Sequence, residues 1–281
     1  MTTPADQKQQ QKSQWGGAAH DWEKWDSWFQ EQTRDLTEWL CDQVALTPGM
    51  QVLDLACGVG QPALTAAMRV APGGRVVATD IAPEMVAAAQ QAAARAGREN
   101  IEFREADLEA IPYPDASFDA VTCRFGLMFC PDPVKGAAEI RRVLKPGGRF
   151  ALAVWAEPQK NVQFTSFLGP LSQIAPGPAP DPSAPGLFRL AAPGELERIL
   201  KEAGLTDFSI EARSEHWEYA SAEAYWETMT ELAAPLKAAT ATLSAETLAR
   251  LKQAVIDGVQ AHNRDGSVRL PTAPLCASGR V

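Results

Sequence analysis

A glycine turn follows an aspartate in the stretch VLDLACGVGQPAL, residues 52–64. Gly58, Gly60 and Ala63 form the pattern G-x-G-x-x-A, in which small residues let the backbone turn sharply and approach a ligand closely. The pattern is typical of dinucleotide sites, and Asp80 follows after about 20 residues, where such sites place an acid for the ribose hydroxyls. By itself the turn leaves an NAD(P)-dependent oxidoreductase open as an interpretation.

Asp54 fits a dinucleotide badly. A pyrophosphate needs positive potential and free amide donors, and a carboxylate on the strand before the turn would repel it. A zwitterionic amino-acid tail on adenosine can instead use that charge to orient its ammonium group. Asp107, after the third expected strand, can reach an adenine edge, and the turn LKPGGRF is not required by an NAD site. These features favour an adenosine ligand with an amino-acid tail.

The elements that position these residues alternate between strand and helix. Apolar runs at 50–57, 75–80, 100–107, 117–127 and 149–157 predict strands, and the patterns at 62–71, 83–97 and 133–144 predict helices. Near-continuous apolar strands between helices are typical of a parallel sheet that is covered on both faces. The prediction is a doubly wound α/β core over residues 49–155.

The flanks have a different texture. Residues 1–13 are polar and predict a disordered tail, and residues 14–48, rich in tryptophan, predict a helical lid. Residues 156–281 predict a mobile Pro/Gly-rich loop at 169–186, a helix at 192–205 and an alternating strand at 206–219. A helical stretch at 221–259, interrupted near Pro235 and at 243–244, and a final strand at 268–281 follow. These parts are expected to cap the substrate and complete the sheet.

Composition excludes several classes of protein. A net charge of -9 and a pI near 5.0 argue against nucleic acid, since no basic excess neutralises phosphates. No apolar run approaches the roughly 20 residues of a bilayer span, and the N-terminus lacks the apolar region of a secretory signal. The five cysteines lack CxxC spacing, so we expect no metal site or disulfide, but buried thiols in a reducing cytoplasm.

With these residues in view, the chain resembles the class I S-adenosylmethionine-dependent methyltransferases, in particular the small-molecule branch that includes the ubiquinone/menaquinone C-methyltransferases. The resemblance is carried, in order, by VLDLACGVG, VVATDIAPEMV, EFREADLEAIPYPDASFDAVTCRFGLMFCPD and EIRRVLKPGGRFALAVW. It implies a Rossmann-like, mostly parallel seven-stranded sheet whose last strand is antiparallel to its neighbours. It also implies S-adenosylmethionine as cofactor, S-adenosylhomocysteine as product and a small organic molecule as methyl acceptor.

The resemblance assigns site residues position by position. The methionine part would be surrounded by Asp54, Ala56, Cys57, Gly58, Gly60 and Gln61 and by the backbone of Arg124 and Phe125. The ribose and adenine would be met by Asp80, Ile81, Met85, Ala106, Asp107 and Leu108. Asp80 would bind both ribose hydroxyls, and Asp107 would accept from the adenine amino group. Gln61 departs from the small residue expected after G-x-G.

Plainer roles stay open beside these assignments. Asp54 can cap a helix or stabilise the turn, Asp80 can N-cap the helix that follows it, and Asp107 can be an ordinary turn residue. The candidate catalytic residues are Arg124, which the resemblance implies would border the acceptor, and His20. An oxygen or nitrogen acceptor can need a general base, and His20 lies in the expected lid. A non-catalytic cofactor-binding module is the further alternative, and the residues do not choose among O-, N-, C- and S-methylation.

Overall fold

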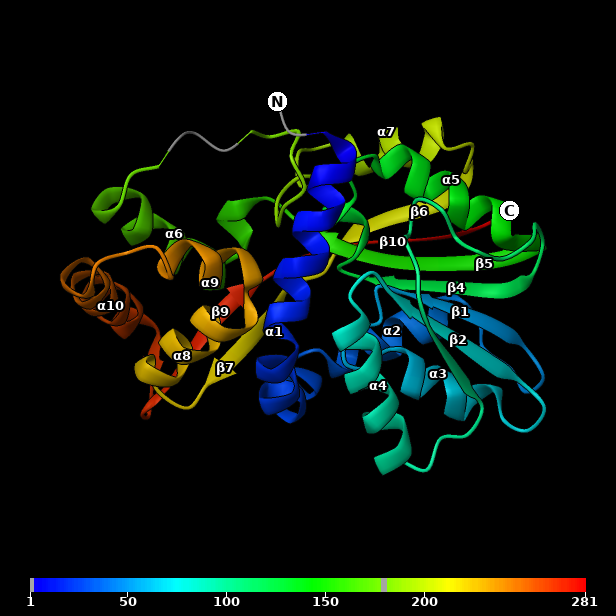
Figure 1. Cartoon of the computed structure of the whole chain (residues 1–281), viewed down its shortest axis with the longest axis horizontal. Coiled ribbons are helices and arrows are strands. Elements are labelled where there is room, and N and C mark those ends of the chain that lie inside the picture. The colour runs from blue at the N-terminus through cyan, green and yellow to red at the C-terminus, as the bar shows by residue number, and fades with distance from the viewer. Residues whose placement is uncertain (1–2, 178–180) are drawn as a thin grey trace.

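The computed structural model describes residues 3–177 and 181–281. One sheet of seven strands runs through it in the order β3-β2-β1-β4-β5-β10-β6 (Figure 1). Its strands are β1 (Gln51–Leu55), β2 (Arg75–Asp80), β3 (Ile101–Glu105), β4 (Phe118–Arg124), β5 (Leu144–Trp155), β6 (Asp207–Ala212) and β10 (Pro274–Arg280). Strands β1 to β5 are parallel, and β10 pairs antiparallel with both β5 and β6. The predicted mostly parallel sheet, with its last strand reversed, is confirmed.

Helices cover both faces of this sheet because its strands are apolar on both sides. Helices α2 (Arg34–Gln43), α3 (Ala63–Val70) and α4 (Pro83–Arg95) lie on one side, and α5 (Pro133–Val143) and α7 (Glu195–Glu202) on the other (Figure 1). Leu36, Leu40 and Val52 belong to the core of the first side, whereas Ile140 and Ile199 belong to that of the second. The sheet is therefore rigidly held, and its strand ends are fixed supports for a site.

The first helix, α1 (Pro4–Gln32), corrects the prediction of a disordered tail over residues 1–13. Thr3 caps it through a capping box with Asp6, and Pro4 stands in its first turn, where a proline is tolerated. Residues 4–13 are therefore helical, and residues 1–2 lie outside the described residues. Figure 1 shows α1 crossing the middle of the molecule, between the seven-stranded sheet and the helices α8 and α9.

The C-terminal part forms the helical cap that α1 faces. It contains α6 (Val162–Ile174), α8 (Ala222–Leu232), α9 (Ala234–Thr240) and α10 (Ala245–Val259). A second sheet joins β7 (Glu215–Tyr219), β9 (Ser267–Thr272) and β8 (Asn263–Arg264). The 3-10 helices are η1 (Leu127–Phe129), η2 (Pro158–Lys160) and η3 (Gln260–His262).

In this part the loop at 169–186 and the strand at 206–219 differ from prediction, whereas the helix breaks agree with it. The expected loop at 169–186 begins later, because α6 continues to Ile174, and its residues 178–180 lie outside the described part. The helical stretch is interrupted at Ala233, near Pro235, which stands in the first turn of α9, and again before Ala245, so both predicted breaks are confirmed. The alternating segment 206–219 is two strands in two sheets, because alternation sets which face is buried but not which edge a strand joins.

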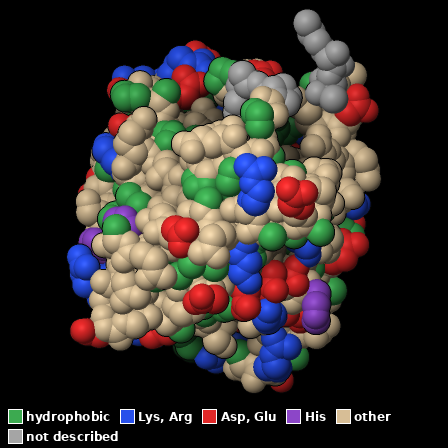
Figure 2. All heavy atoms as spheres, turned by 90° about the vertical axis from the view of Figure 1, so that its left-hand side faces the viewer, with side chains coloured by type: hydrophobic (Ala, Val, Ile, Leu, Met, Phe, Trp, Pro, Cys, Tyr) green, Lys and Arg blue, Asp and Glu red, His purple; other side chains and the backbone are tan. Residues whose placement is uncertain are grey.

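Among the described residues, no helix is both long and apolar enough to cross a bilayer. On the face formed by the helical cap, acidic and basic side chains lie interspersed (Figure 2).

Candidate functional site

A cavity of about 180 Å³ opens at the carboxyl ends of β1, β2 and β4. In an open parallel sheet, ligands bind at this edge. The lining includes twelve of the residues that the sequence analysis assigned to a cofactor, namely Ala56, Cys57, Gly58, Gln61, Asp80, Ile81, Met85, Ala106, Asp107, Leu108, Arg124 and Phe125. Segments that are distant in the sequence thus meet around one space.

The turns after β1 and β4 lie against each other at the cavity floor. Ala56 and Phe125 both take positive φ angles, 53° and 60°, which are uncommon for residues with a side chain and concentrate at functional sites. A Cβ on Gly126 would stand 2.5 Å from the Cβ of Ala56, so only glycine allows this approach. The backbone at both strand ends is therefore shaped for a ligand rather than for a regular strand.

Asp80 joins the glycine turn to the end of β2. Its Oδ2 accepts from the Gly58 amide at 3.0 Å, and its Oδ1 accepts from the Ala82 amide at 3.0 Å, so it also fixes the start of α4. Burial raises the pKa of this carboxyl to about 6, while the two amides act in the opposite direction. Each oxygen keeps a second lone pair, so the carboxylate can still accept from ligand hydroxyls.

Asp54 and Gly60 are the two assigned cofactor residues that do not line the cavity. Asp54 is fully buried behind the turn, where it accepts from the Ala63 amide at the start of α3 and from the Thr122 hydroxyl, at 3.1 and 2.6 Å. Asp54 therefore has the helix-capping role that stayed open in the sequence analysis. This role corrects the expectation that its side chain surrounds the methionine part. Gly60, with φ of 125°, shapes the turn, since a Cβ there would crowd Leu64.

Asp107 is engaged by a residue that sequence reasoning missed. Lys8, from the first turns of α1, lies 2.7 Å from both the Asp107 and the Glu109 carboxylates. Asp107 also accepts from the Glu109 amide, and Glu109 is buried and accepts from the Asp132 amide. Lys8 thereby ties α1 to the end of the cavity that Asp107 lines. The tail in which it stands was expected to be disordered, so no signal pointed to it.

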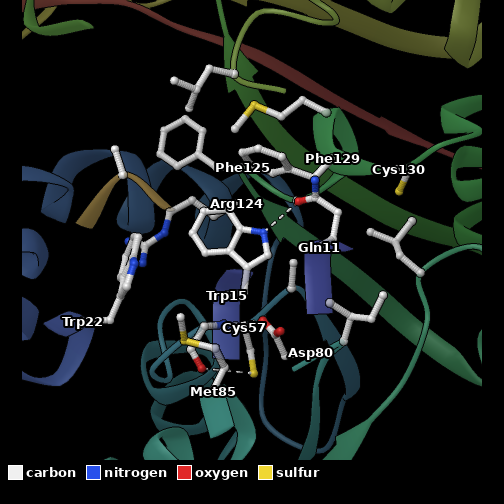
Figure 3. A pocket seen from close by; sticks show the side chains of 18 of the residues that line it. Gln11, Trp15, Trp22, Cys57, Asp80, Met85, Arg124, Phe125, Phe129 and Cys130 are labelled. Carbon is white, nitrogen blue, oxygen red and sulfur yellow. Dashed lines mark hydrogen bonds between the residues drawn. The ribbon is translucent and has the colours of Figure 1, made fainter. Parts of the chain in front are cut away.

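Helix α1 presents one face to the cavity, with Lys8, Gln11, Trp15, Trp22 and Phe29. Trp15 stands in the middle of the space, with Phe129 on one side and Met85 and Asp80 on the other, and its indole N–H donates to Gln11 at 3.0 Å (Figure 3). The prediction that the N-terminal tryptophans close the site is consistent with this position.

His20 is exposed and does not line the cavity, which corrects its candidacy as a catalytic base. Two residues before Trp22, it projects about 200° around the helix, away from the cavity. Within the described part of the chain no histidine lines this space. Cys57 and Cys130 line it, but burial raises the pKa of both thiols well above the ordinary value, so they remain neutral. No cluster of metal ligands was found among the described residues.

An aromatic wall closes the side of the cavity opposite the glycine turn. Phe125 stacks on Trp155 with the ring centroids 4.0 Å apart, and Trp155 meets Phe164 and Trp217 edge-on at 5.1 and 5.5 Å. Phe29 meets Trp217 at 5.5 Å. Apart from Phe125, sequence reasoning missed these residues, because they come from four separate elements and carry no motif. The wall suits a flat, apolar ligand.

Arg124 lies where β4 meets this wall. The side chain is 9 % exposed, and its Nη1 donates to the hydroxyls of Thr33 and Thr37 at 2.8 and 2.9 Å. Its guanidinium carbon lies 5.0 Å from the centre of the Phe29 ring. The sequence analysis placed its backbone beside the cofactor, and the structure brings the side chain to the cavity as well.

Comparison with known proteins agrees with this geometry. A methyltransferase domain family matches residues 53–152. A demethylmenaquinone methyltransferase of Thermus thermophilus is 46% identical over 110 residues, which cover 39% of this chain and 49% of that protein. The chain therefore spans about half the length of this relative.

Two solved structures share the fold over most of the chain. The [4+2]-cyclase SpnF is 25% identical with a TM-score of 0.51, covering 88% of this chain and 80% of that one. The geranyl diphosphate C-methyltransferase of Streptomyces coelicolor, solved with S-adenosyl-L-homocysteine, is 19% identical with a TM-score of 0.51, covering 88% and 79%. Residues 53–152 therefore resemble a methyltransferase domain in sequence, and the two solved structures share the fold of the chain.

Proposed function

We propose that the whole chain transfers a methyl group from S-adenosylmethionine to a small, apolar, aromatic organic acceptor. The observation that carries the proposal is the meeting of the glycine turn, Asp80 and the aromatic wall around one cavity. A fold alone does not fix a reaction, so the proposal depends on these side chains.

The residues at the cavity fit the groups of this cofactor. Asp80 would accept from the ribose hydroxyls, Ile81 and Met85 would pack on the adenine, and Asp107 would accept from its amino group. Ala56 and Gly58 let the backbone approach the methionine part. The cofactor supplies an electrophilic methyl carbon on a sulfonium, and the aromatic wall would hold the acceptor about 3–3.5 Å from that carbon.

The present cavity is smaller than such a ligand needs. Its volume of about 180 Å³ lies below the ~300–1,000 Å³ of ordinary ligand pockets. Trp15 occupies the centre, so α1 would have to shift when the cofactor enters (Figure 3). We therefore assign residues 14–48, with the earlier turns of α1, to a lid over the core of 49–155. Residues 156–281 would supply the loop, the acceptor cap and the remaining strands of the sheet. The five buried free thiols support a reducing compartment, the cytoplasm, as the place of action.

Calorimetry with S-adenosylhomocysteine and with NADH tests the proposal. We expect the first to bind with a micromolar dissociation constant or tighter and the second not to bind, because the buried Asp54 carboxyl and the acids at the cavity disfavour a pyrophosphate. Binding of NADH alone would mean that the oxidoreductase alternative is right. Cofactor binding without methyl transfer to any phenol, amine, thiol or activated carbon of a panel would favour a non-catalytic module.

The lid assignment predicts the effect of Lys8→Met. Loss of the contacts with Asp107 and Glu109 should let α1 open more often and speed S-adenosylhomocysteine association up to about fivefold, since partly exposed ion pairs contribute ~0–1 kcal/mol. Stopped-flow tryptophan fluorescence measures the rate. Lys24→Met, which breaks an α1–α8 pair with Glu231, is the matched control and should leave the rate unchanged. An unchanged rate in Lys8→Met would show that Lys8 does not hold a lid.

A further inference from the structure

Arg124 is a buried cation whose hydrogen-bonding capacity is only partly used. Its Nη1 is held by two neutral hydroxyls, those of Thr33 and Thr37. Within residues 3–177 and 181–281, its Nε and Nη2 make no hydrogen bond and no carboxylate lies within 4.0 Å of the guanidinium. Because a guanidinium carries five N–H donors, several remain for a ligand in the cavity that Arg124 lines.

The charges around Arg124 act at longer range. Burial lowers the pKa of the guanidinium to about 10, whereas Asp54 from β1, Asp26 from α1 and the Cys41 thiol of α2 act in the opposite direction. Arg124 therefore stays positive at neutral pH. A buried charge without a close partner is costly, and an anion that enters the cavity would lower this cost.

The surroundings of Arg124 indicate what kind of ligand would carry that negative charge. The guanidinium lies against Phe29, and Phe125 begins the stacked wall next to it. Its two anchors, Thr33 and Thr37, stand where α1 joins α2. The cation thus borders the apolar, aromatic side of the cavity. A flat molecule against this wall would meet one positive charge at its edge.

The cavity supplies no histidine to remove a proton from such a molecule, within the described residues. Its carboxylates lie elsewhere: Asp80 contacts the glycine turn, and Asp107 and Glu109 are paired with Lys8. Arginine itself does not act as a base, because its pKa is too high. A hydroxyl-bearing acceptor would therefore have to react as an anion that is already formed, and a guanidinium stabilises that form through charge-assisted hydrogen bonds.

We propose that Arg124 binds the acceptor, and that the acceptor is an apolar aromatic molecule with an acidic hydroxyl, bound as its oxyanion. This inference rests on the proposed methyl transfer. The hydroxyl proton passes to water when the acceptor ionises. The oxyanion, or a ring carbon conjugated with it, then forms a bond to the methyl carbon as the carbon–sulfur bond breaks and its electron pair goes to sulfur. Attack by carbon is completed when that carbon releases its proton to water.

Two probes test the inference without turnover: 4-nitro-1-naphthol, whose anion absorbs visible light, and 1-nitronaphthalene, which lacks the hydroxyl. Wild-type protein should lower the apparent pKa of bound nitronaphthol by about one unit or more, which corresponds to tenfold tighter binding of the anion. Arg124→Met should abolish the shift and weaken naphtholate binding at pH 8 about 10- to 100-fold, as expected for lost hydrogen bonds to a charged group. Nitronaphthalene should bind both proteins within twofold, and Arg124→Lys should recover part of the shift.

Calorimetry with S-adenosylhomocysteine on the same proteins separates this inference from the proposed function. If wild type does not bind it but naphtholate binding still depends on Arg124, the proposed function is wrong and the anion site stands. If Arg124→Met loses S-adenosylhomocysteine and keeps naphtholate, Arg124 serves the carboxylate of the cofactor and the inference is wrong. Failure of wild type to prefer nitronaphthol over nitronaphthalene, or to bind either, also overturns it.

Thr37→Val provides a second variant if Arg124→Met does not fold. It keeps the guanidinium but removes one of the two hydroxyls that hold Nη1. We expect naphtholate to bind severalfold more weakly and nitronaphthalene to bind as before. Equal naphtholate binding by Thr37→Val and wild type would count against a positioned guanidinium.

Discussion

Asp80→Asn is expected to weaken the binding of S-adenosylhomocysteine about 100-fold at pH 8. The carboxylate accepts from the Gly58 and Ala82 amides and, in the proposed complex, from the ribose hydroxyls. Asparagine keeps the shape but loses the charge, and its NH2 group would face one of the two backbone amides. Hydrogen bonds to a charged group contribute ~1.5–3 kcal/mol each, and about 2.7 kcal/mol corresponds to 100-fold in affinity. Calorimetry measures the change.

The pH dependence of this affinity gives the same prediction a second readout. Because burial raises the pKa of Asp80 to about 6, the side chain is ionised at pH 8 and largely protonated at pH 5. Wild-type affinity should therefore fall as the pH drops through 6, and the affinity of Asp80→Asn should change much less. Asp119→Asn is the control, because Asp119 contacts Lys145 and the Gln51 amide and does not line the cavity. Equal losses in both variants would contradict a ligand role for Asp80.

The sequence predicted the parts of the site that are local in the chain. The glycine turn, Asp80 and Asp107 each follow a strand, and the carboxyl ends of parallel strands meet at one edge. A short apolar run followed by a polar residue is therefore enough to place such side chains. The same holds for the sheet, whose parallel strands are marked by apolar runs between helices.

The aromatic wall and the polar start of α1 could not be predicted in this way. Phe29, Trp155, Phe164 and Trp217 meet only when four elements fold together, and each taken alone reads as an ordinary core residue. The polar start of α1 reads as a tail because its helix depends on the cap at Thr3 and on contacts of Lys8 with distant carboxylates. Long-range pairing of this kind leaves no periodic signal.

Asp54 shows how one residue can be singled out correctly and interpreted incorrectly. An acid in an apolar strand is unusual, and the sequence analysis used it to favour S-adenosylmethionine. The structure places its carboxyl behind the turn, bound to the Ala63 amide and the Thr122 hydroxyl. Asp54→Asn should therefore weaken S-adenosylhomocysteine binding less than tenfold, well below the effect of Asp80→Asn. An equal loss would mean that the ammonium group does reach Asp54.

Asp54→Asn should also change how stability depends on pH, which is the second large effect that we expect. Burial raises the pKa of Asp54 from 3.8 to about 7, opposed by the Thr122 hydroxyl, the Arg124 charge and the Ala63 amide. Between these two values the folded protein holds a proton that the unfolded chain has lost. Unfolding therefore releases a proton, so the free energy of unfolding falls as the pH rises toward 7 and levels off once the folded carboxyl ionises.

The neutral asparagine does not titrate, so the variant lacks this dependence of the free energy of unfolding on pH. One pKa unit corresponds to 1.36 kcal/mol. The free energy of unfolding of Asp54→Asn should therefore rise by about 2–3 kcal/mol relative to that of wild type as the pH rises from 5 to 8. Urea unfolding of both proteins at several pH values measures the difference.

The pKa of Asp80 is raised in the same direction, but its effect on the free energy of unfolding is present in both proteins and cancels from the difference. Parallel curves for wild type and Asp54→Asn would instead mean that Asp54 is ionised throughout this range, held so by the positive charge of Arg124.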